Sequence, residues 1–308
     1  MAIQEDSLKL LGFKSMDMVF DSTVTMIQNR AAGIDRPLRT RWGKLNGYWN
    51  GGVEKSTIYV IGGRPGVGKS AFVNKLLFDI FDCNPEQKVI ILYFNFEMIS
   101  EMQIMRELSA ITSLKVSDLL SATLPVPESA IVNIKAMRTN LIRYPIYFMD
   151  KPVPVFRMQQ IVEDVAAKHP EYHIVCVTDH TRLVKPAKEA NELERLNALA
   201  ETTMYLAKAT GASFIHLSQL NRNIESPERG HGLYVPMLSD LFAADSIGQV
   251  AHVVGILQRP EMYQLTTYLN GENCENLLAL HLVKNRNGAV LWLPFQHNLA
   301  INSITERI

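Results

Sequence analysis

The residues best suited to carry out chemistry form one eight-residue segment with the sequence GRPGVGKS. The spacing G-x-x-x-x-G-K-[ST] is that of the phosphate-binding P-loop, in which glycines let the backbone approach a triphosphate closely. Lys69 can reach the β- and γ-phosphates, and the hydroxyl of Ser70 can hold Mg²⁺. The candidate nucleotide-binding residues are Gly63, Arg64, Pro65, Gly66, Val67, Gly68, Lys69, Ser70 and Ala71.

The segments on either side of this loop match what the motif requires. Residues 57–62 are β-branched and apolar, which predicts a buried strand, and residues 71–81 carry apolar side chains at helical spacing. A helix that begins at the loop directs its first N–H groups at the phosphates. An ordinary Gly-rich turn does not need both flanks, so the sequence predicts a site for ATP and Mg²⁺ between this strand and this helix.

Two acidic residues follow two other apolar strands. Glu97 comes after the strand predicted at residues 88–96, and Asp179 comes after the strand predicted at residues 172–178. A carboxylate at the end of a strand next to the P-loop strand can polarise an attacking water. Glu97 could equally cap the helix that begins near Ser100. Asp179 fits the Walker B pattern, in which the acid orients Mg²⁺ through water.

Strands and helices alternate through most of the chain. Further strands are predicted at residues 145–149, 212–217, 251–257, 277–283 and 289–294, and further helices at 101–110, 129–141, 155–168, 192–210 and 238–248. The alternation predicts an α/β fold with a mostly parallel sheet. The last strands extend one edge, where Asn287-Gly288 indicates a β-hairpin with Lys284 and Arg286 at its tip. The P-loop, both acids and Gln219 then lie at the carboxyl ends of strands, where ligands bind.

The first 37 residues contain one predicted helix, Ser15–Arg30. Its apolar side chains recur at spacings of three and four and form one face; they are Met16, Val19, Phe20, Val24 and Ile27. Residues 31–37 break the helix and separate it from a domain predicted for residues 38–308. The apolar face packs either on the helix's own domain or on a neighbouring subunit.

Composition sets limits on the class of protein. The formal net charge is zero, so a DNA site must come from local loops rather than from bulk charge. Cys83, Cys176 and Cys274 are far apart, which fits a reducing compartment and indicates no zinc site. The N-terminus lacks an apolar signal core, and no stretch is long and apolar enough to span a membrane. These features predict a cytoplasmic protein without a membrane partner.

Six segments in fixed order carry a family resemblance. The set GGRPGVGKS, FNFEM, IVCVTDH, HLSQLNR, LQRPEMY and VKNRNG resembles the ATPase domain of DnaB-type replicative helicases over residues 38–295. The P-loop alone is shared by very many ATPases, whereas the later segments are typical of this branch of the RecA-like fold. The resemblance implies an ATP- and Mg²⁺-dependent helicase that forms a hexameric ring and draws single-stranded DNA through its channel. Primase, a loader or other replication proteins are the implied partners.

The resemblance also implies roles for matching residues. Glu97 matches the catalytic glutamate that activates water, and Gln219 matches the sensor that couples the γ-phosphate to the DNA-facing loops. Lys284 and Arg286 match basic residues that reach the ATP of the adjacent subunit. Arg286 would be the arginine finger, which requires an oligomer.

The resemblance also implies nucleotide- and DNA-binding roles for further arginines. The match places Arg259 of LQRPEMY with the nucleotide-binding residues. The loops after Asp179 and Gln219 would line the DNA channel with Arg182, Arg222 and Arg229, although solvated loops also hold such residues.

The chain departs from the family pattern at several places. The helix Ser15–Arg30 occupies the place of the family's linker helix, which favours docking on the next subunit, but no globular N-terminal domain precedes it. Phe242-Ala243-Ala244 replaces a basic and acidic segment, and Gly248 stands where an acid is common. His180 replaces the more usual tyrosine, as in some phage helicases, which indicates a phage or mobile-element origin. These departures leave two alternatives open: a RecA-, RadA- or KaiC-like ATPase, and a helicase accessory or loader protein without unwinding activity.

Overall fold

The computed structural model describes residues 11–185, 191–241 and 244–307. The chain divides into two compact units, Met1–Pro37 and Leu38–Ile308. In the first unit, α2 (Met16–Ala31) begins after the extended Ser15, as the sequence predicts, and none of its side chains is buried within that unit. No helix of the described residues has the length and apolar character needed to cross a membrane.

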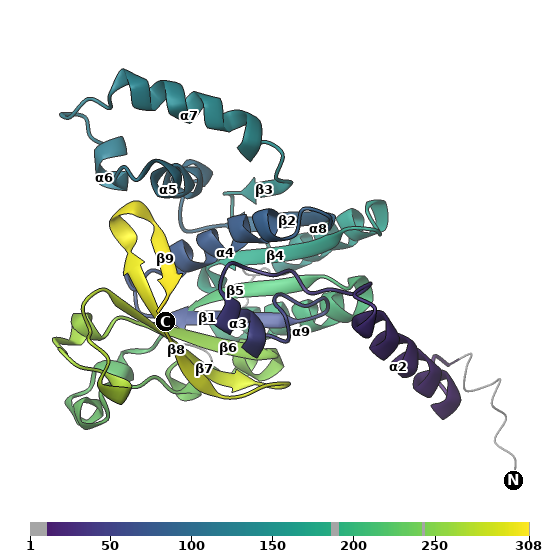
Figure 1. The fold of residues 1–308 in the computed structure, drawn as a ribbon. Helices are drawn as coiled ribbons and strands as arrows, with labels where there is room; N and C mark the ends of the chain where they lie inside the picture. Colours follow the sequence, from purple (N-terminus) through teal and green to yellow (C-terminus); the bar gives the residue numbers. More distant parts are fainter. Residues whose placement is uncertain (1–10, 186–190, 242–243, 308) are drawn as a thin grey trace, which may run out of the picture. The chain divides into compact units, whose positions relative to one another are not determined.

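The second unit is built on one sheet with the strand order β3-β2-β4-β5-β1-β6-β7-β8-β9 (Figure 1). The described strands are β1 (Ile58–Gly63), β2 (Val89–Asn95), β3 (Ile146–Met149), β4 (His173–Asp179), β5 (Ser213–Gln219), β6 (Val253–Gln258), β7 (Leu277–Asn285), β8 (Leu291–Asn298) and β9 (Ser303–Glu306). Pairing is parallel from β3 through β6 and antiparallel from β6 through β9. The predicted α/β fold, with a mostly parallel sheet extended at one edge by C-terminal strands, is confirmed.

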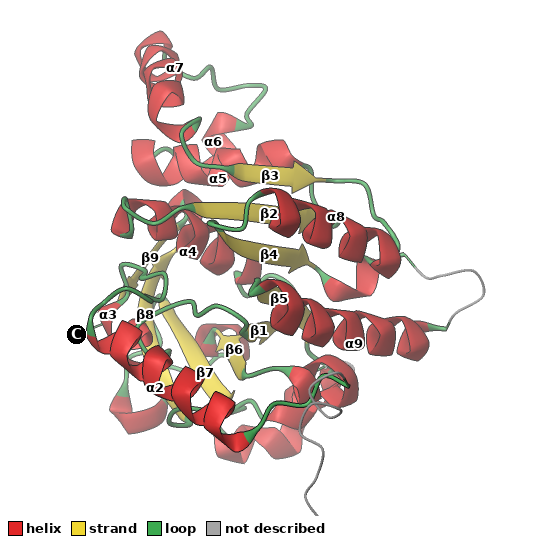
Figure 2. Ribbon diagram, turned by 90° about the vertical axis from the view of Figure 1, so that its right-hand side faces the viewer, coloured by secondary structure: helices red, strands yellow, loops and turns green. Residues whose placement is uncertain are grey.

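Helices cover both faces of this sheet (Figure 2). The α-helices described in this unit are α3 (Gly43–Tyr48), α4 (Lys69–Cys83), α5 (Ser100–Thr112), α6 (Val116–Leu119), α7 (Glu128–Leu141), α8 (Val155–Lys168) and α9 (Glu192–Thr210). The buried side chains of α3 and α4 belong to one hydrophobic cluster, and those of α8 and α9 belong to a second. The sheet therefore lies between two helical layers.

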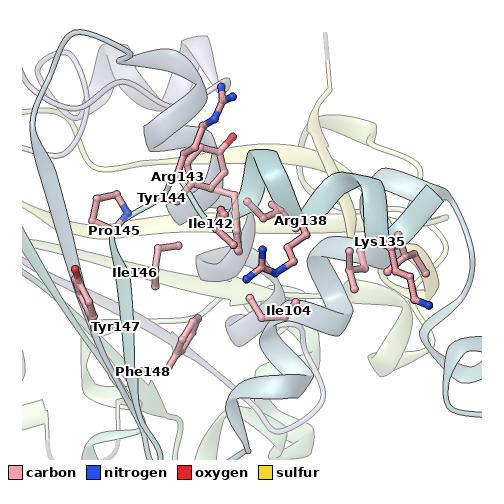
Figure 3. Close-up of a pocket in the computed structure, with 14 residues that line it drawn as sticks. Ile104, Lys135, Arg138, Ile142, Arg143, Tyr144, Pro145, Ile146, Tyr147 and Phe148 are labelled. Carbon is pink, nitrogen blue, oxygen red and sulfur yellow. The ribbon is translucent and has the colours of Figure 1, made fainter. Parts of the chain in front are cut away.

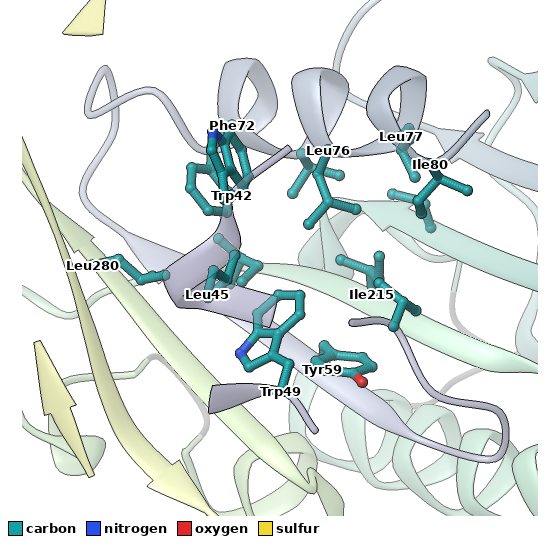
Figure 4. Close-up of a cluster of buried hydrophobic side chains, with 14 of the residues drawn as sticks. Trp42, Leu45, Trp49, Tyr59, Phe72, Leu76, Leu77, Ile80, Ile215 and Leu280 are labelled. Atoms are coloured by element: carbon teal, nitrogen blue, oxygen red, sulfur yellow. The ribbon is translucent and has the colours of Figure 1, made fainter. Parts of the chain in front are cut away.

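Alternation along β1 explains why both faces are covered. Tyr59 and Ile61 belong to the cluster with α3 and α4, whereas Ile58 and Val60 belong to the cluster with α8 and α9. Successive side chains of a strand point to opposite faces, so a strand that is apolar throughout needs a layer on each side. Figure 4 shows the first cluster, with side chains from α3 and α4 gathered over the sheet. This packing fixes the start of α4, and with it the P-loop.

Three structural expectations are corrected. The predicted helix at residues 238–248 is wrong: Leu238–Asp240 is a 3-10 turn, Leu241 is extended, and a π-turn covers Ala244–Gly248. Leu241 pairs as an isolated bridge with Leu220, which draws the backbone out of a helix. The altered segment at Phe242 and Ala243 lies outside the described residues. The strand β9 was not predicted, and β2 is separated from β1 by β4 and β5 rather than lying next to it.

Candidate functional site

A cavity of about 380 Å³ opens at the carboxyl ends of the parallel strands. It is lined by Pro65, Gly66, Gly68, Lys69, Ser70, Ala71, Glu97, Met98, Met102, Arg106, Val116, Gln219, Leu299 and Asn302. The structure thus brings much of the P-loop together with Glu97, which follows β2, and Gln219, the last residue of β5. Parallel strands place their carboxyl ends on one edge of the sheet, so residues far apart in the sequence meet there.

The P-loop backbone has the conformation that a phosphate cradle needs. Gly66 and Gly68 have φ angles of 77° and 106°, a region that favours glycine. A Cβ atom at Gly63 would lie 2.6 Å from a methyl carbon of Val67, so a larger residue would distort the loop. The 15-residue helix α4 begins directly after Gly68, and its first N–H groups and helix dipole favour an anion. These features fit a bound triphosphate.

Lys69 is buried at the start of α4, with 8% of its surface exposed. Its Nζ donates to the carbonyl oxygens of Gly63 at 3.0 Å and Arg64 at 3.3 Å. Burial lowers the pKa of Lys69, and the carboxylates of Asp179 and Glu97 oppose that shift. Charged phosphate oxygens are stronger acceptors than these neutral carbonyl oxygens, so the ammonium group can turn to a phosphate when one binds.

Asp179 and Ser70 offer oxygen atoms suited to Mg²⁺. The Asp179 side chain is fully buried at the end of β4, and its Oδ1 atom has no hydrogen-bond partner among the described residues. Burial raises the pKa of Asp179, and a hydrogen bond from Ser70 lowers it. A buried carboxylate oxygen beside a hydroxyl fits a hard divalent cation, which prefers oxygen ligands. The described residues contain no cluster of three His, Cys, Asp or Glu side chains for a metal, so Mg²⁺ would also need phosphate and water oxygens.

The side chains of Glu97 and Gln219 both lie close to the imidazole ring of His180, the residue after Asp179. The His180 Nε2 atom lies 3.8 Å from the Glu97 Oε2 atom and 3.4 Å from the Gln219 Nε2 atom. The Nδ1 atom of His180 accepts the Arg182 N–H at 3.2 Å, and burial lowers the pKa of the ring. The Glu97 N–H donates to the Asp179 carbonyl at 3.2 Å, which joins the ends of β2 and β4.

The same cavity holds residues that sequence reasoning missed. Arg106 of α5 lines it, and its guanidinium donates to Gln103 Oε1 at 3.3 Å. Asn302 reaches it from the turn before β9, and its amide donates to Asn74 of α4 at 3.2 Å. The helical spacing of Met102 and Arg106 places them on one face of α5, which was the available signal. No local pattern pointed to Asn302.

Some predicted nucleotide contacts do not line this cavity: Lys284, Arg286 and Arg259, together with Gly63, Arg64 and Val67 of the P-loop. Lys284 donates from Nζ to the carbonyl oxygens of Gly248 at 2.9 Å and Gln249 at 2.8 Å, and Arg286 donates to Gln249 at 3.2 Å. The guanidinium of Arg259 pairs with Glu261. The structure does not bring Lys284, Arg286 and Arg259 to the P-loop of their own chain.

The predicted DNA contacts differ in their surroundings. Arg222 is exposed on a 3-10 turn after β5, and Arg182 pairs with Glu192 at 2.8 Å. Arg229 donates to both carboxylate oxygens of Asp240, at 3.0 and 2.9 Å. A bidentate pair of this kind fixes the guanidinium against Asp240, and the role of Arg229 as a DNA contact stays a prediction. Its place in the structure is to hold the turn at residues 238–240.

A second cavity of about 740 Å³ lies between α5, α7 and β3 (Figure 3). Its lining is mainly apolar and aromatic, with Lys135, Arg138 and Arg143 among the residues around it. Figure 3 shows Arg138 and Lys135 on α7, with Lys135 farther than Arg138 from Tyr147 and Phe148 of β3. We call this cavity the α7 groove.

The sheet and the nucleotide cavity define a RecA-like P-loop ATPase fold. The chain belongs to the DnaB-like helicase C-terminal domain family, whose profile matches residues 38–306. It is similar to a probable replicative DNA helicase of Trieres chinensis, with 29% identity over 254 residues, covering 80% of this chain and 53% of that protein.

Solved structures share the fold. One of them, an isolated ATPase domain, has a TM-score of 0.81 at 19% identity, covering 96% of this chain and 100% of that one. A DnaB-like replicative helicase, solved in a study of its interactions with primase, has a TM-score of 0.78 at 20% identity, covering 98% of this chain and 71% of that one. The chain spans about half the length of the curated relatives it matches.

Proposed function

We propose that this chain is the motor domain of a replicative DNA helicase, which hydrolyses ATP to move along single-stranded DNA. The observation that carries the proposal is the cavity in which Lys69, Glu97 and Gln219 meet, within a member of the DnaB-like family. Relatives that match this chain are named as replicative DNA helicases, which favours this function over that of a RecA-, RadA- or KaiC-like ATPase.

The P-loop, Glu97, Gln219 and the neighbouring Asp179 each have a task in the proposed ATP hydrolysis. The P-loop N–H groups and Lys69 hold the phosphates and neutralise their charge. Ser70 and Asp179 would hold Mg²⁺, which neutralises charge on the β- and γ-phosphate oxygens when it is bound. Glu97 accepts a proton from the attacking water. Gln219, at the end of β5, senses the γ-phosphate and leads directly into the turn that bears Arg222.

The hydrolytic site is completed by a neighbouring copy. Lys284 and Arg286 lie outside the cavity of their own chain, which suits residues that act on the ATP of an adjacent subunit. A head-to-tail interface that closes on itself forms a ring, and six subunits is the number we propose. Primase or a loader would bind such an assembly from outside this motor domain.

The helix α2 is proposed to dock in the α7 groove of the next subunit. It carries exposed apolar side chains, including Phe20 at 64% and Ile27 at 60%, and the groove is apolar. Asp17 and Asp21 of α2 complement the positive charges of Lys135, Arg138 and Arg143 around the groove. Exposed apolar surface of this extent marks an interaction site.

Phe20→Asp is expected to reduce assembly, because it would place a charge in the apolar groove. Ser22→Asp is the matched control, since two residues along a helix correspond to about 200° of rotation. Light scattering at equal protein concentration measures the mass of each variant with an ATP analogue. If Phe20→Asp assembles to the same mass as the wild type, the proposal that α2 docks at the interface is contradicted.

The function itself is tested by ATP hydrolysis with and without single-stranded DNA. We expect strong stimulation that weakens steeply with salt, because contacts to phosphates release counterions. Lys69→Ala is the control and should be inactive under both conditions. Hydrolysis that is indifferent to DNA would contradict the motor proposal and favour a regulatory or accessory ATPase.

A further inference from the structure

Arg64, inside the P-loop, is tied by its side chain to the segment that follows β5. Its Nε atom lies 2.7 Å from Glu225 Oε1, and its Nη1 atom donates to the Leu220 carbonyl at 3.1 Å. The Arg64 side chain is 19% exposed and that of Glu225 is 45% exposed. One guanidinium therefore holds a backbone atom and a carboxylate of the same short segment.

The backbone carbonyl of Arg64 accepts a hydrogen bond from Lys69, the residue proposed to bind the phosphates. Lys69 Nζ donates to the Arg64 carbonyl at 3.3 Å as well as to that of Gly63 at 3.0 Å. An ammonium group that turns to a triphosphate gives up these carbonyl oxygens, because charged phosphate oxygens are the stronger acceptors. Nucleotide binding would thus change the contacts of Arg64 on its backbone side, whereas the contacts of its side chain with residues 220 and 225 do not involve Lys69.

The attached segment is itself cross-linked to the turn at residues 238–241. The Asn221 N–H donates to the Asp240 carbonyl at 2.8 Å, and the Asn221 side chain donates to the Ser239 carbonyl at 3.0 Å. Arg229 then holds Asp240 through two hydrogen bonds. Ile224 is fully buried, so the segment cannot swing freely. A shift at residue 220 or 225 is passed on because these contacts form one network.

We propose that Arg64 and Glu225 are positioning residues that transmit the state of the nucleotide site to residues 220–241. This connection runs through the P-loop and is separate from the side chain of Gln219. Its consequence for DNA rests on the motor function proposed above, since Arg222 lies in the same segment. The link from nucleotide to segment does not depend on DNA.

Hydrogen–deuterium exchange of residues 220–229 tests the link without DNA. The Ser226 N–H, bonded to the Asn223 carbonyl at 3.2 Å, is one reporter. In the wild type, a saturating concentration of a non-hydrolysable ATP analogue with Mg²⁺ should change the amide exchange rates in this segment by about fivefold. Glu225→Gln should abolish most of that change. Glu228→Gln is the matched control, because Glu228 is an exposed acid three residues away. An unchanged response in Glu225→Gln, or no response in the wild type, overturns the proposal.

ATP hydrolysis separates this inference from the motor function. Glu225→Gln should leave DNA-free hydrolysis unchanged and reduce the stimulation by single-stranded DNA about fivefold, whereas Glu228→Gln should keep it. If single-stranded DNA does not stimulate the wild type, the proposed motor function is contradicted. The exchange experiment then still tests the connection between the nucleotide site and residues 220–241. Full stimulation in Glu225→Gln overturns the proposed link to DNA while the motor function stands.

Discussion

Glu97→Gln is expected to bind ATP as tightly as the wild type and to hydrolyse it about 10²- to 10⁴-fold more slowly. The amide has the size of the carboxylate but cannot accept a proton from the attacking water. Phosphate binding depends on the P-loop and Lys69, which extend from the end of β1 to the start of α4 and do not include the segment after β2. The change therefore acts on the chemical step and leaves the ground state intact.

Two measurements check this expectation. Binding of a fluorescent ATP analogue gives the affinity, and single-turnover hydrolysis gives the rate of the chemical step. Glu101→Gln is a matched control, because Glu101 is an exposed acid in the first turn of α5, four residues from Glu97. Equal losses of binding and hydrolysis in Glu97→Gln would mean that Glu97 supports the fold of the site instead. The alternative role of Glu97 as a helix cap is wrong: the N-cap residue of α5 is Ile99, and the Ser100 N–H donates to Asp150 Oδ2 at 3.1 Å instead of to Glu97.

The P-loop and most helices could be predicted because their signals are local. For α9, the predicted bounds equal the observed Glu192–Thr210, since both ends carry signals in the sequence. The side chains of Asn191 and Glu194 form a capping box, and Gly211 ends the helix in the left-handed conformation. Such contacts connect residues only a few positions apart, so the sequence alone contains them.

Features that depend on distant residues could not be predicted. The order of strands puts β4 and β5 between β2 and β1, although β2 follows β1 in the chain. The segment at residues 238–248 has helical spacing, but Arg229 and Leu220 hold parts of it in other conformations. Asn302 reaches the nucleotide cavity because β9 pairs with β8, and neither residue type nor spacing indicates that pairing.

Arg286→Ala is expected to inactivate hydrolysis about 10³- to 10⁵-fold in a homogeneous assembly, the range for loss of an arginine finger. Arg286 is exposed at the turn after β7, and its N–H donates to the His252 carbonyl at 2.9 Å, so the backbone there is anchored. The substitution removes the positive charge that the guanidinium would place beside the transferring phosphoryl group of the neighbouring subunit. It leaves the P-loop of the same chain undisturbed. ATP binding should therefore persist in Arg286→Ala and fail in Lys69→Ala.

A mixture of these two inactive variants distinguishes action on a neighbour from action within one chain. In a mixed ring, an Arg286→Ala subunit keeps an intact P-loop and can receive the finger of a Lys69→Ala subunit. With equal amounts mixed at random, about one interface in four combines both intact parts, so hydrolysis should reappear at a corresponding fraction of the wild-type rate. Rates must be compared with mass measurements that demonstrate mixed assemblies. Mixed rings without any recovered hydrolysis would exclude a finger that acts in trans, because at those interfaces every other required group is present.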